Sequence, residues 1–226
     1  MPFFQSVDEA IRTFVILVVF LFVAFPVHEF AHAFAAYRLG DGTARLFGRL
    51  TLNPVAHFDP FGGLLLAVTL ISSGGSSGFG WAKPTPVVPH NLRGGRRGEA
   101  IVAAAGPVSN LILAAAAAIP FRILLASHAD VPSLVLTILL TFISINILLL
   151  VFNLVPVPPL DGSKVLFAFM SPATAYQVRP LLERYGFLIL LAAIFLPIPP
   201  TGEPAISIVF DVIGRPLFLL LTGLPG

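Results

Sequence analysis

Residues 24–36 of the chain have the sequence AFPVHEFAHAFAA, an apolar segment that contains a His-Glu-x-x-His motif. On a helix, His28 and His32 lie one turn apart on the same face, so both imidazoles can reach one metal ion. Glu29 follows the first histidine and can contact a metal-bound water rather than the metal itself. Polar groups are costly in hydrocarbon, so this cluster inside an apolar segment indicates a functional site.

The composition of the chain indicates an integral membrane protein. Of its 226 residues, 57% are hydrophobic and only 11% are charged, whereas a soluble domain has about 25% charged residues. The absence of cysteine excludes disulfide frameworks, thiol nucleophiles and cysteine-ligated zinc sites. Residues 1–9 have neither a basic region nor a small-residue cleavage site, which predicts no removable signal peptide. We expect one domain, residues 1–226, with a core at 10–171 and C-terminal helices at 176–223.

The apolar segments predict an all-α polytopic membrane protein with about five to six membrane helices. A helix needs about 20 apolar residues to cross a bilayer. In the first segment, Pro26 removes a backbone donor one turn before the metal motif and predicts a local kink. The predicted membrane helices are residues 10–37, 99–125, 132–155, 179–197 and 204–222.

The region between the first two motif-bearing helices has a different pattern. Residues 44–52 partly alternate apolar with polar and predict a short strand or hairpin arm. The following apolar run, residues 64–71, is too short to cross a bilayer. If both flanks are cytoplasmic, residues 54–82 form a re-entrant hairpin that satisfies the positive-inside rule, whereas a full span at 61–73 puts four basic residues outside. The basic residues of the two flanks are Arg38, Arg45, Arg49, Lys83, Arg93, Arg96 and Arg97.

A run of prolines precedes the best candidate for a third metal ligand. Pro156, Pro158 and Pro159 predict a non-helical stretch at membrane depth, which is tolerated only where it is buried in protein or lines a polar cavity. With a re-entrant hairpin, the next two helices return Asp161 to the end of the bundle that holds the histidines. A zinc hydrolase needs three protein ligands and an open position for water. Asp161 is therefore the first candidate, and Asp59 is the second.

Together these motifs resemble the site-2 proteases, which are zinc metalloproteases that cut inside the membrane, in their short bacterial form without a PDZ domain. The resemblance covers about residues 20–170. It rests on the His-Glu-x-x-His motif, on Gly106-Pro107, on NLVPVPPLDG at residues 153–162, on Asn53-Pro54 to Pro60, and on GWAKP at residues 80–84.

The resemblance implies one zinc ion per chain, held by His28, His32 and Asp161, with Glu29 as the general base. It also implies that Asn153 helps to hold an unwound substrate. The expected substrate is a transmembrane protein, and the expected partners include the lipid bilayer but no nucleic acid. The expected location is a prokaryotic cell membrane, with the active site toward the cytoplasm. We expect the extended substrate to add as a strand to the edge formed by residues 44–52 and the re-entrant hairpin.

Two further polar residues have both a functional and a structural interpretation. His57 either gates or supports the site, or is a hydrogen-bonded loop histidine. Asn110 either lines the site and binds substrate, or forms an interhelical hydrogen bond. Two other functions also stay open at this point: a catalytically silent homologue that binds membrane proteins, and a metal-handling membrane protein. The complete ligand set with Glu29 argues against the first, and the lack of inverted repeats argues against the second.

Overall fold

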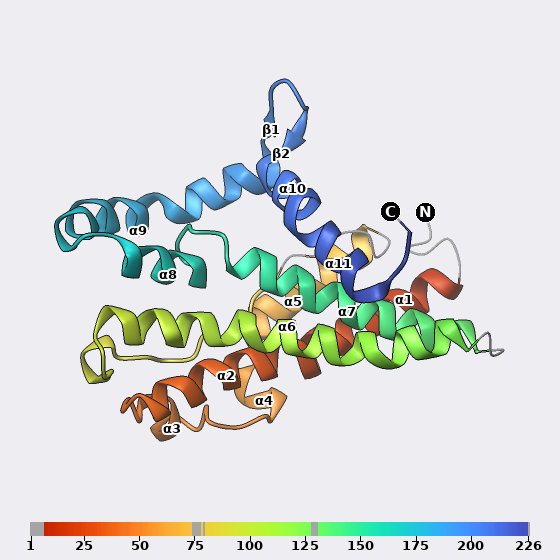
Figure 1. Cartoon of the computed structure of the whole chain (residues 1–226), viewed down its shortest axis with the longest axis horizontal. Helices are drawn as coiled ribbons and strands as arrows, with labels where there is room; N and C mark the ends of the chain where they lie inside the picture. The colour runs from red at the N-terminus through yellow and green to blue at the C-terminus, as the bar shows by residue number, and fades with distance from the viewer. Residues whose placement is uncertain (1–6, 74–77, 79, 128–130, 226) are drawn as a thin grey trace.

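The computed structural model describes residues 7–73, 78, 80–127 and 131–225, and it is almost entirely helical (Figure 1). The all-α prediction is confirmed. In chain order the elements are α1 (Val7–Val19), the π-helical turn η1 (Phe20–Ala24), α2 (Phe25–Arg38), α3 (Thr43–Leu46), α4 (Pro54–His57), α5 (Pro60–Ser72), the 3-10 turn η2 (Pro89–Asn91), α6 (Arg96–Ala126), α7 (Ser133–Asn153), α8 (Asp161–Phe169), α9 (Pro172–Phe195), β1 (Pro197–Ile198), β2 (Glu203–Pro204), α10 (Ala205–Val209), the π-helical turn η3 (Phe210–Gly214) and α11 (Arg215–Thr222).

Among the described residues, four helical segments are long and apolar enough to cross a membrane. They are Thr13–Arg38, Arg96–Ala126, Ser133–Asn153 and Ala205–Thr222. The predicted membrane helix at residues 179–197 lies mostly within α9. This helix is not among the four membrane-spanning segments, and it carries the charged residues Arg179, Glu183 and Arg184. The 13 residues of α5 are about 20 Å long, which is too short to cross about 30 Å of hydrocarbon. The chain is therefore a multi-pass membrane protein.

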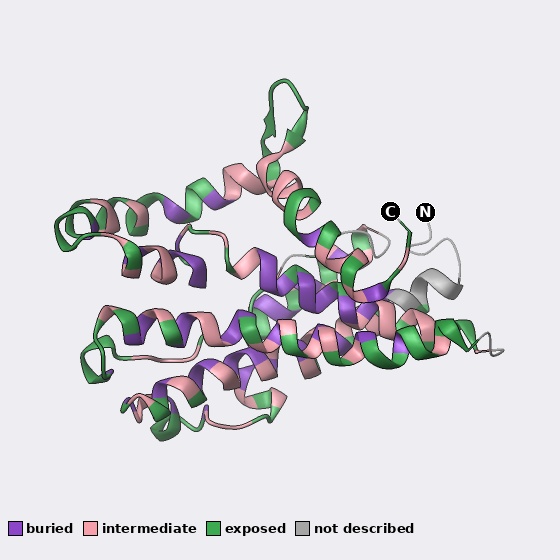
Figure 2. Cartoon of the chain, viewed as in Figure 1, coloured by how far each residue is buried: buried purple, intermediate pink, exposed green. Residues whose placement is uncertain are grey.

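The core forms where α6 packs against α2, α7 and α8. Figure 1 shows α6 and α7 side by side along the longest axis of the molecule, and Figure 2 shows buried segments on both helices and on α2. Small side chains on α6 let these helices approach closely, and packing contacts stabilise helix pairs in a membrane. One buried cluster joins Ala114, Ala118 and Phe121 of α6 to residues of α7, which are Ile143, Ile147 and Val151.

The kink predicted at Pro26 takes the form of a π-helical turn. η1 ends at Ala24, two residues before Pro26. The same arrangement recurs near the C-terminus, where η3 ends at Gly214, two residues before Pro216. A proline inside a helix lacks the N–H donor, and its ring crowds the carbonyl four residues earlier. The wider π turn accommodates the ring while the helix continues.

The strand predicted at residues 44–52 is wrong. The chain instead forms α3, because the buried carboxylate of Asp41 accepts hydrogen bonds from the N–H and hydroxyl groups of Thr43 and so starts a helical turn. Gly48 then adopts a positive φ of 67°, which breaks the alternation that the sequence suggested. Within the described residues, the strands are confined to β1 and β2, an antiparallel pair that joins α9 to α10.

The segment between α2 and α6 starts and finishes at the same end of α2. The N–H of Arg93 donates to the carbonyl of Leu39 at 2.8 Å, and the N–H of Val88 donates to Asp41 Oδ2 at 2.7 Å. Nearer α5, the N–H of Lys83 donates to the carbonyl of His57 at 2.9 Å. The two arms that flank α5 are therefore bonded to each other, which is the arrangement that the re-entrant prediction requires.

We predict that Asp41→Ala destabilises the fold. Asp41 is fully buried, and its carboxylate accepts hydrogen bonds from Thr43, Val88 and Asn91. Burial alone would raise the pKa of Asp41, but these bonds outweigh burial and hold the pKa below its ordinary value. Leaving the donors unpaired should lower the free energy of unfolding by about 1.5–3 kcal/mol, measured by thermal unfolding in detergent.

The control for Asp41→Ala is Thr201→Ala, an exposed position in the β1–β2 turn. Because the folded pKa of Asp41 is depressed, the carboxylate contributes stability above the unfolded pKa of about 4, and that contribution is lost as the pH falls through the folded pKa. An Asp41→Ala protein as stable as wild type near neutral pH would contradict this account of the segment.

Candidate metal centre

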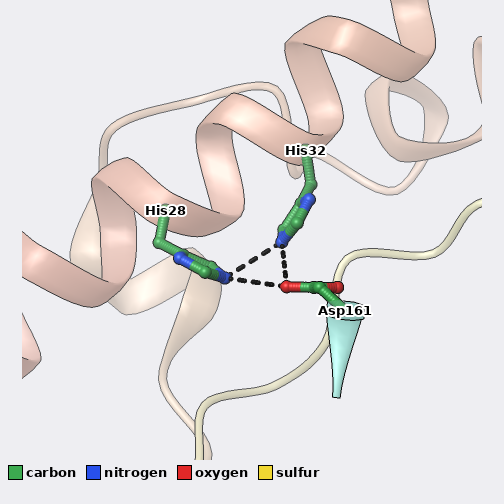
Figure 3. Close-up of side chains that lie close together, drawn as sticks. All are labelled: His28, His32 and Asp161. Carbon is green, nitrogen blue, oxygen red and sulfur yellow. Dashed lines mark hydrogen bonds and ion pairs between the residues drawn. The ribbon is translucent and has the colours of Figure 1, made fainter. Parts of the chain in front are cut away.

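Two histidines of α2 and the first residue of α8 point toward one another (Figure 3). His28 Nε2 lies 3.3 Å and His32 Nε2 lies 3.0 Å from Asp161 Oδ2, and the two Nε2 atoms are 3.0 Å apart. All three residues are buried. The structure thus brings the sequence-predicted metal ligands into one cluster, although they come from positions about 130 residues apart in the chain.

The far side of each imidazole is fixed by α6. His32 Nδ1 is 2.7 Å from the carbonyl of Val102, which can only accept, so this nitrogen carries a proton. His28 Nδ1 is 2.6 Å from Asn110 Oδ1. The amide of Asn110 donates in turn to Asn146, whose amide donates to the carbonyl of Phe142. This chain of donors runs toward a carbonyl, so Asn110 presents its oxygen to a protonated His28 Nδ1.

The donor set fits zinc. Because each neutral imidazole carries its proton on Nδ1, both Nε2 atoms present lone pairs to each other and to the Asp161 oxygen. Three acceptors at 3.0–3.3 Å repel one another unless a metal ion or a proton lies between them. Zinc binds imidazole nitrogen and carboxylate oxygen at about 2.0–2.2 Å, which separates tetrahedral ligands by about 3.3 Å. The spacing of the three atoms is close to that value.

Gly106 lets α6 approach the two histidines. A Cβ atom at this position would lie 2.4 Å from His32 Nε2 and 2.6 Å from His28 Nε2, which is too close for any side chain. The sequence suggested Gly106-Pro107 only through the family resemblance. The structure gives the physical reason, because a residue with a side chain here would displace the Nε2 atoms of His28 and His32.

Glu29 lies beside the cluster in a cavity of about 820 Å³. Its side chain is mostly buried, and its Oε2 accepts a hydrogen bond of 2.8 Å from the N–H of Thr85. The sequence did not identify Thr85 as a site residue, because the interaction uses a backbone N–H that any residue except proline supplies. The flanking prolines in PTP at residues 84–86 were the available signal, since they predict an extended chain.

The remaining predicted site residues differ in whether they line the cavity beside the cluster. Asn153 lines the cavity, and its amide donates to the carbonyl of Leu149. Asn110 is fully buried behind His28 and is not among the described residues that line the cavity. His57 is also buried and outside that lining, with Nε2 bonded to the carbonyl of Thr51. Asp59, the second candidate ligand, caps α5 through Phe61 and Gly62 and is not part of the cluster.

Comparisons with known proteins assign the chain to a family. Residues 120–196 match the model described as Peptidase family M50, a stretch that includes Asp161. The chain is also 39% identical over 216 residues to "Putative zinc metalloprotease YwhC" of Bacillus subtilis (strain 168), an alignment that covers 89% of this chain and 93% of the relative. The chain belongs to peptidase family M50.

Two further relatives of this M50 protein come from mycobacteria. "Putative zinc metalloprotease Rip2" of Mycolicibacterium smegmatis is 31% identical over 188 residues, which cover 83% of this chain and 69% of the relative. The protein of the same name from Mycobacterium tuberculosis (strain ATCC 25618 / H37Rv) is 31% identical over 185 residues, which cover 81% of this chain and 68% of the relative. No solved structure matches the chain. The predicted resemblance to site-2 proteases is confirmed, and the M50 chain is a zinc metalloprotease by family.

We predict that Gly106→Ala removes bound metal. The added methyl group would overlap the Nε2 atoms of His28 and His32, so zinc affinity should fall by more than about tenfold, as metal sites do when their supporting contacts are lost. Metal analysis of the purified protein measures this. The control is Val108→Ala, an exposed position on the same helix. Unchanged zinc content in Gly106→Ala would contradict the close approach of α6.

We also predict that Asn110→Ala weakens metal binding without unfolding the helices. Removing the oxygen that accepts from His28 Nδ1 frees the imidazole to rotate and to change tautomer. Such losses typically reduce metal affinity by about 10–100-fold. Asn110→Asp retains an acceptor oxygen and should bind zinc more tightly than Asn110→Ala in a competition titration with a chelator. Equal affinities for the two variants would refute the proposed tautomer control.

Proposed function

We propose that this M50 protein is an intramembrane zinc metalloprotease that hydrolyses peptide bonds in or near transmembrane segments of membrane proteins. The observation that carries the proposal is a buried cluster of two imidazoles and a carboxylate beside Glu29, at a cavity within a bundle of membrane helices. In this proposal one zinc ion per chain is held by His28, His32 and Asp161.

Each residue of the site has a role in this proposal. Bound zinc would lower the pKa of a water molecule and polarise the scissile carbonyl. Glu29 is not a member of the ligand cluster but lines the same cavity, so its carboxylate is available to take the proton of the attacking water. The same carboxylate then delivers that proton to the leaving amine. Asn153 lines the cavity and offers an amide group to the unwound peptide.

The lining of the cavity supports an apolar, helical substrate. A transmembrane helix hides its amides in its own hydrogen bonds and must unwind locally before hydrolysis. Since residues 44–52 do not form a strand, we withdraw the proposal that substrate pairs with that edge. The apolar residues that line the cavity include Phe20, Phe25, Leu148, Leu149, Phe152, Ile206 and Phe210.

We further propose a prokaryotic cell membrane as the location, with the metal centre toward the cytoplasm. Arg38 ends α2 and Arg96 begins α6, and basic residues near membrane helices favour the cytoplasmic side. His32 lies less than two turns before Arg38, so the metal centre is close to that end of the bundle.

The alternative functions differ from the protease in whether they require Glu29. A catalytically silent binding protein or a metal-handling protein needs no carboxylate beside the ligands. The mostly buried Glu29 at the cavity, with one oxygen held by a backbone donor, favours the protease.

Glu29→Gln tests the proposal. The amide cannot take a proton from water, so cleavage of a model single-span substrate should fall by at least about 10²–10⁴-fold, while zinc content stays at the wild-type level. The control is Glu203→Gln, an exposed glutamate in β2. Full activity in Glu29→Gln would end the proposal, and a zinc-loaded wild-type protein that cleaves no transmembrane substrate would favour the binding function.

A further inference from the structure

One residue of the segment between α5 and η2 makes two hydrogen bonds to Glu29. The N–H of Thr85 donates to Glu29 Oε2 at 2.8 Å, and the Thr85 hydroxyl donates to the Glu29 backbone carbonyl at 3.1 Å. The two residues are 56 positions apart in the chain. Thr85 therefore joins the segment between α5 and η2 to both the side chain and the backbone of Glu29.

The chain around Thr85 is held on both sides. Pro84 and Pro86 have fixed φ angles and no N–H, so Thr85 supplies the one backbone donor of this tripeptide. Lys83 is bonded to the carbonyl of His57, and Val88 is bonded to Asp41. A donor fixed in this way loses little conformational entropy when it binds a carboxylate.

We propose that Thr85 is a positioning residue, whose backbone N–H holds Glu29 Oε2 so that Oε1 faces the reacting water. The inference rests on the proposed function and deepens it. Within the described residues, Oε1 has no hydrogen-bond partner, and Glu29 lines the cavity. An unrestrained carboxylate rotates and presents either oxygen at many angles. The Thr85 amide selects one orientation, and well-oriented groups react much faster than freely rotating ones.

Amide hydrogen exchange tests the interaction without any requirement for activity. The protein is labelled with ¹⁵N-threonine, and the Thr85 signal is identified by its disappearance in Thr85→Ser. The Glu29→Gln side chain retains an oxygen that accepts from Thr85, whereas Glu29→Ala has none. We expect the Thr85 amide to exchange at least about tenfold faster in Glu29→Ala than in Glu29→Gln, with zinc content matched. Equal exchange rates in the two variants would overturn the proposed hydrogen bond.

Kinetics test the consequence. Thr85→Pro removes the amide donor and suits an extended proline-flanked chain, whereas Thr85→Ala removes only the hydroxyl. We expect kcat for a model transmembrane substrate to be at least about tenfold lower in Thr85→Pro than in Thr85→Ala, equivalent to about 1.4 kcal/mol, with KM unchanged. Thr85→Ser, which keeps both donors, should restore the wild-type kcat.

These outcomes separate the inference from the proposed function. If the wild-type protein cleaves the substrate but Thr85→Pro and Thr85→Ala have equal kcat values, the positioning role is refuted and the protease stands. If the wild-type protein cleaves nothing, the proposed function fails and only the exchange result applies. If Thr85→Pro loses zinc or fails to fold, the exchange rates in the two Glu29 variants decide the inference.

Discussion

Two imidazole nitrogens and a carboxylate oxygen lie within 3.0–3.3 Å of one another, and such a cluster is stable only with a metal ion or a proton between its atoms. α6 carries three of the supporting features. Val102 and Asn110 fix the protons on the outer nitrogens of the histidines, and Gly106 leaves room for their inner nitrogens. Because α6 also packs on α2, α7 and α8, it aligns the two elements that contribute His28, His32 and Asp161 to the cluster.

The segment between α2 and α6 completes the site from the other side. Its two arms are tied together through Lys83 and His57 and are anchored to the end of α2 by Asp41. This anchoring places Thr85 against Glu29, so the residue beside the His28, His32 and Asp161 cluster is held by the segment between α2 and α6.

Much of the site could be predicted because its signals are local or follow from topology. His28 and His32 are one helical turn apart, and the proline run before Asp161 predicts a non-helical approach on the same side of the bundle. The contribution of Val102 could not be predicted, because a backbone carbonyl carries no residue-type signal, and the prolines around Thr85 predict an extended chain but not its partner. The strand at 44–52 was predicted wrongly because Asp41 starts a helical turn through Thr43, and the distant donors Val88 and Asn91 hold the Asp41 carboxylate in place.

X-ray absorption spectroscopy at the zinc edge tests whether His28, His32 and Asp161 bind zinc, since it reports the ligands of the metal in the intact protein. We expect one zinc per chain, with two imidazole ligands and oxygen ligands at about 2.0–2.2 Å. We expect the number of imidazole ligands to be unchanged in Glu29→Gln and to fall by one in His32→Ala. A purified wild-type protein that binds no zinc, or a zinc site whose spectrum is the same in His32→Ala, would contradict the account.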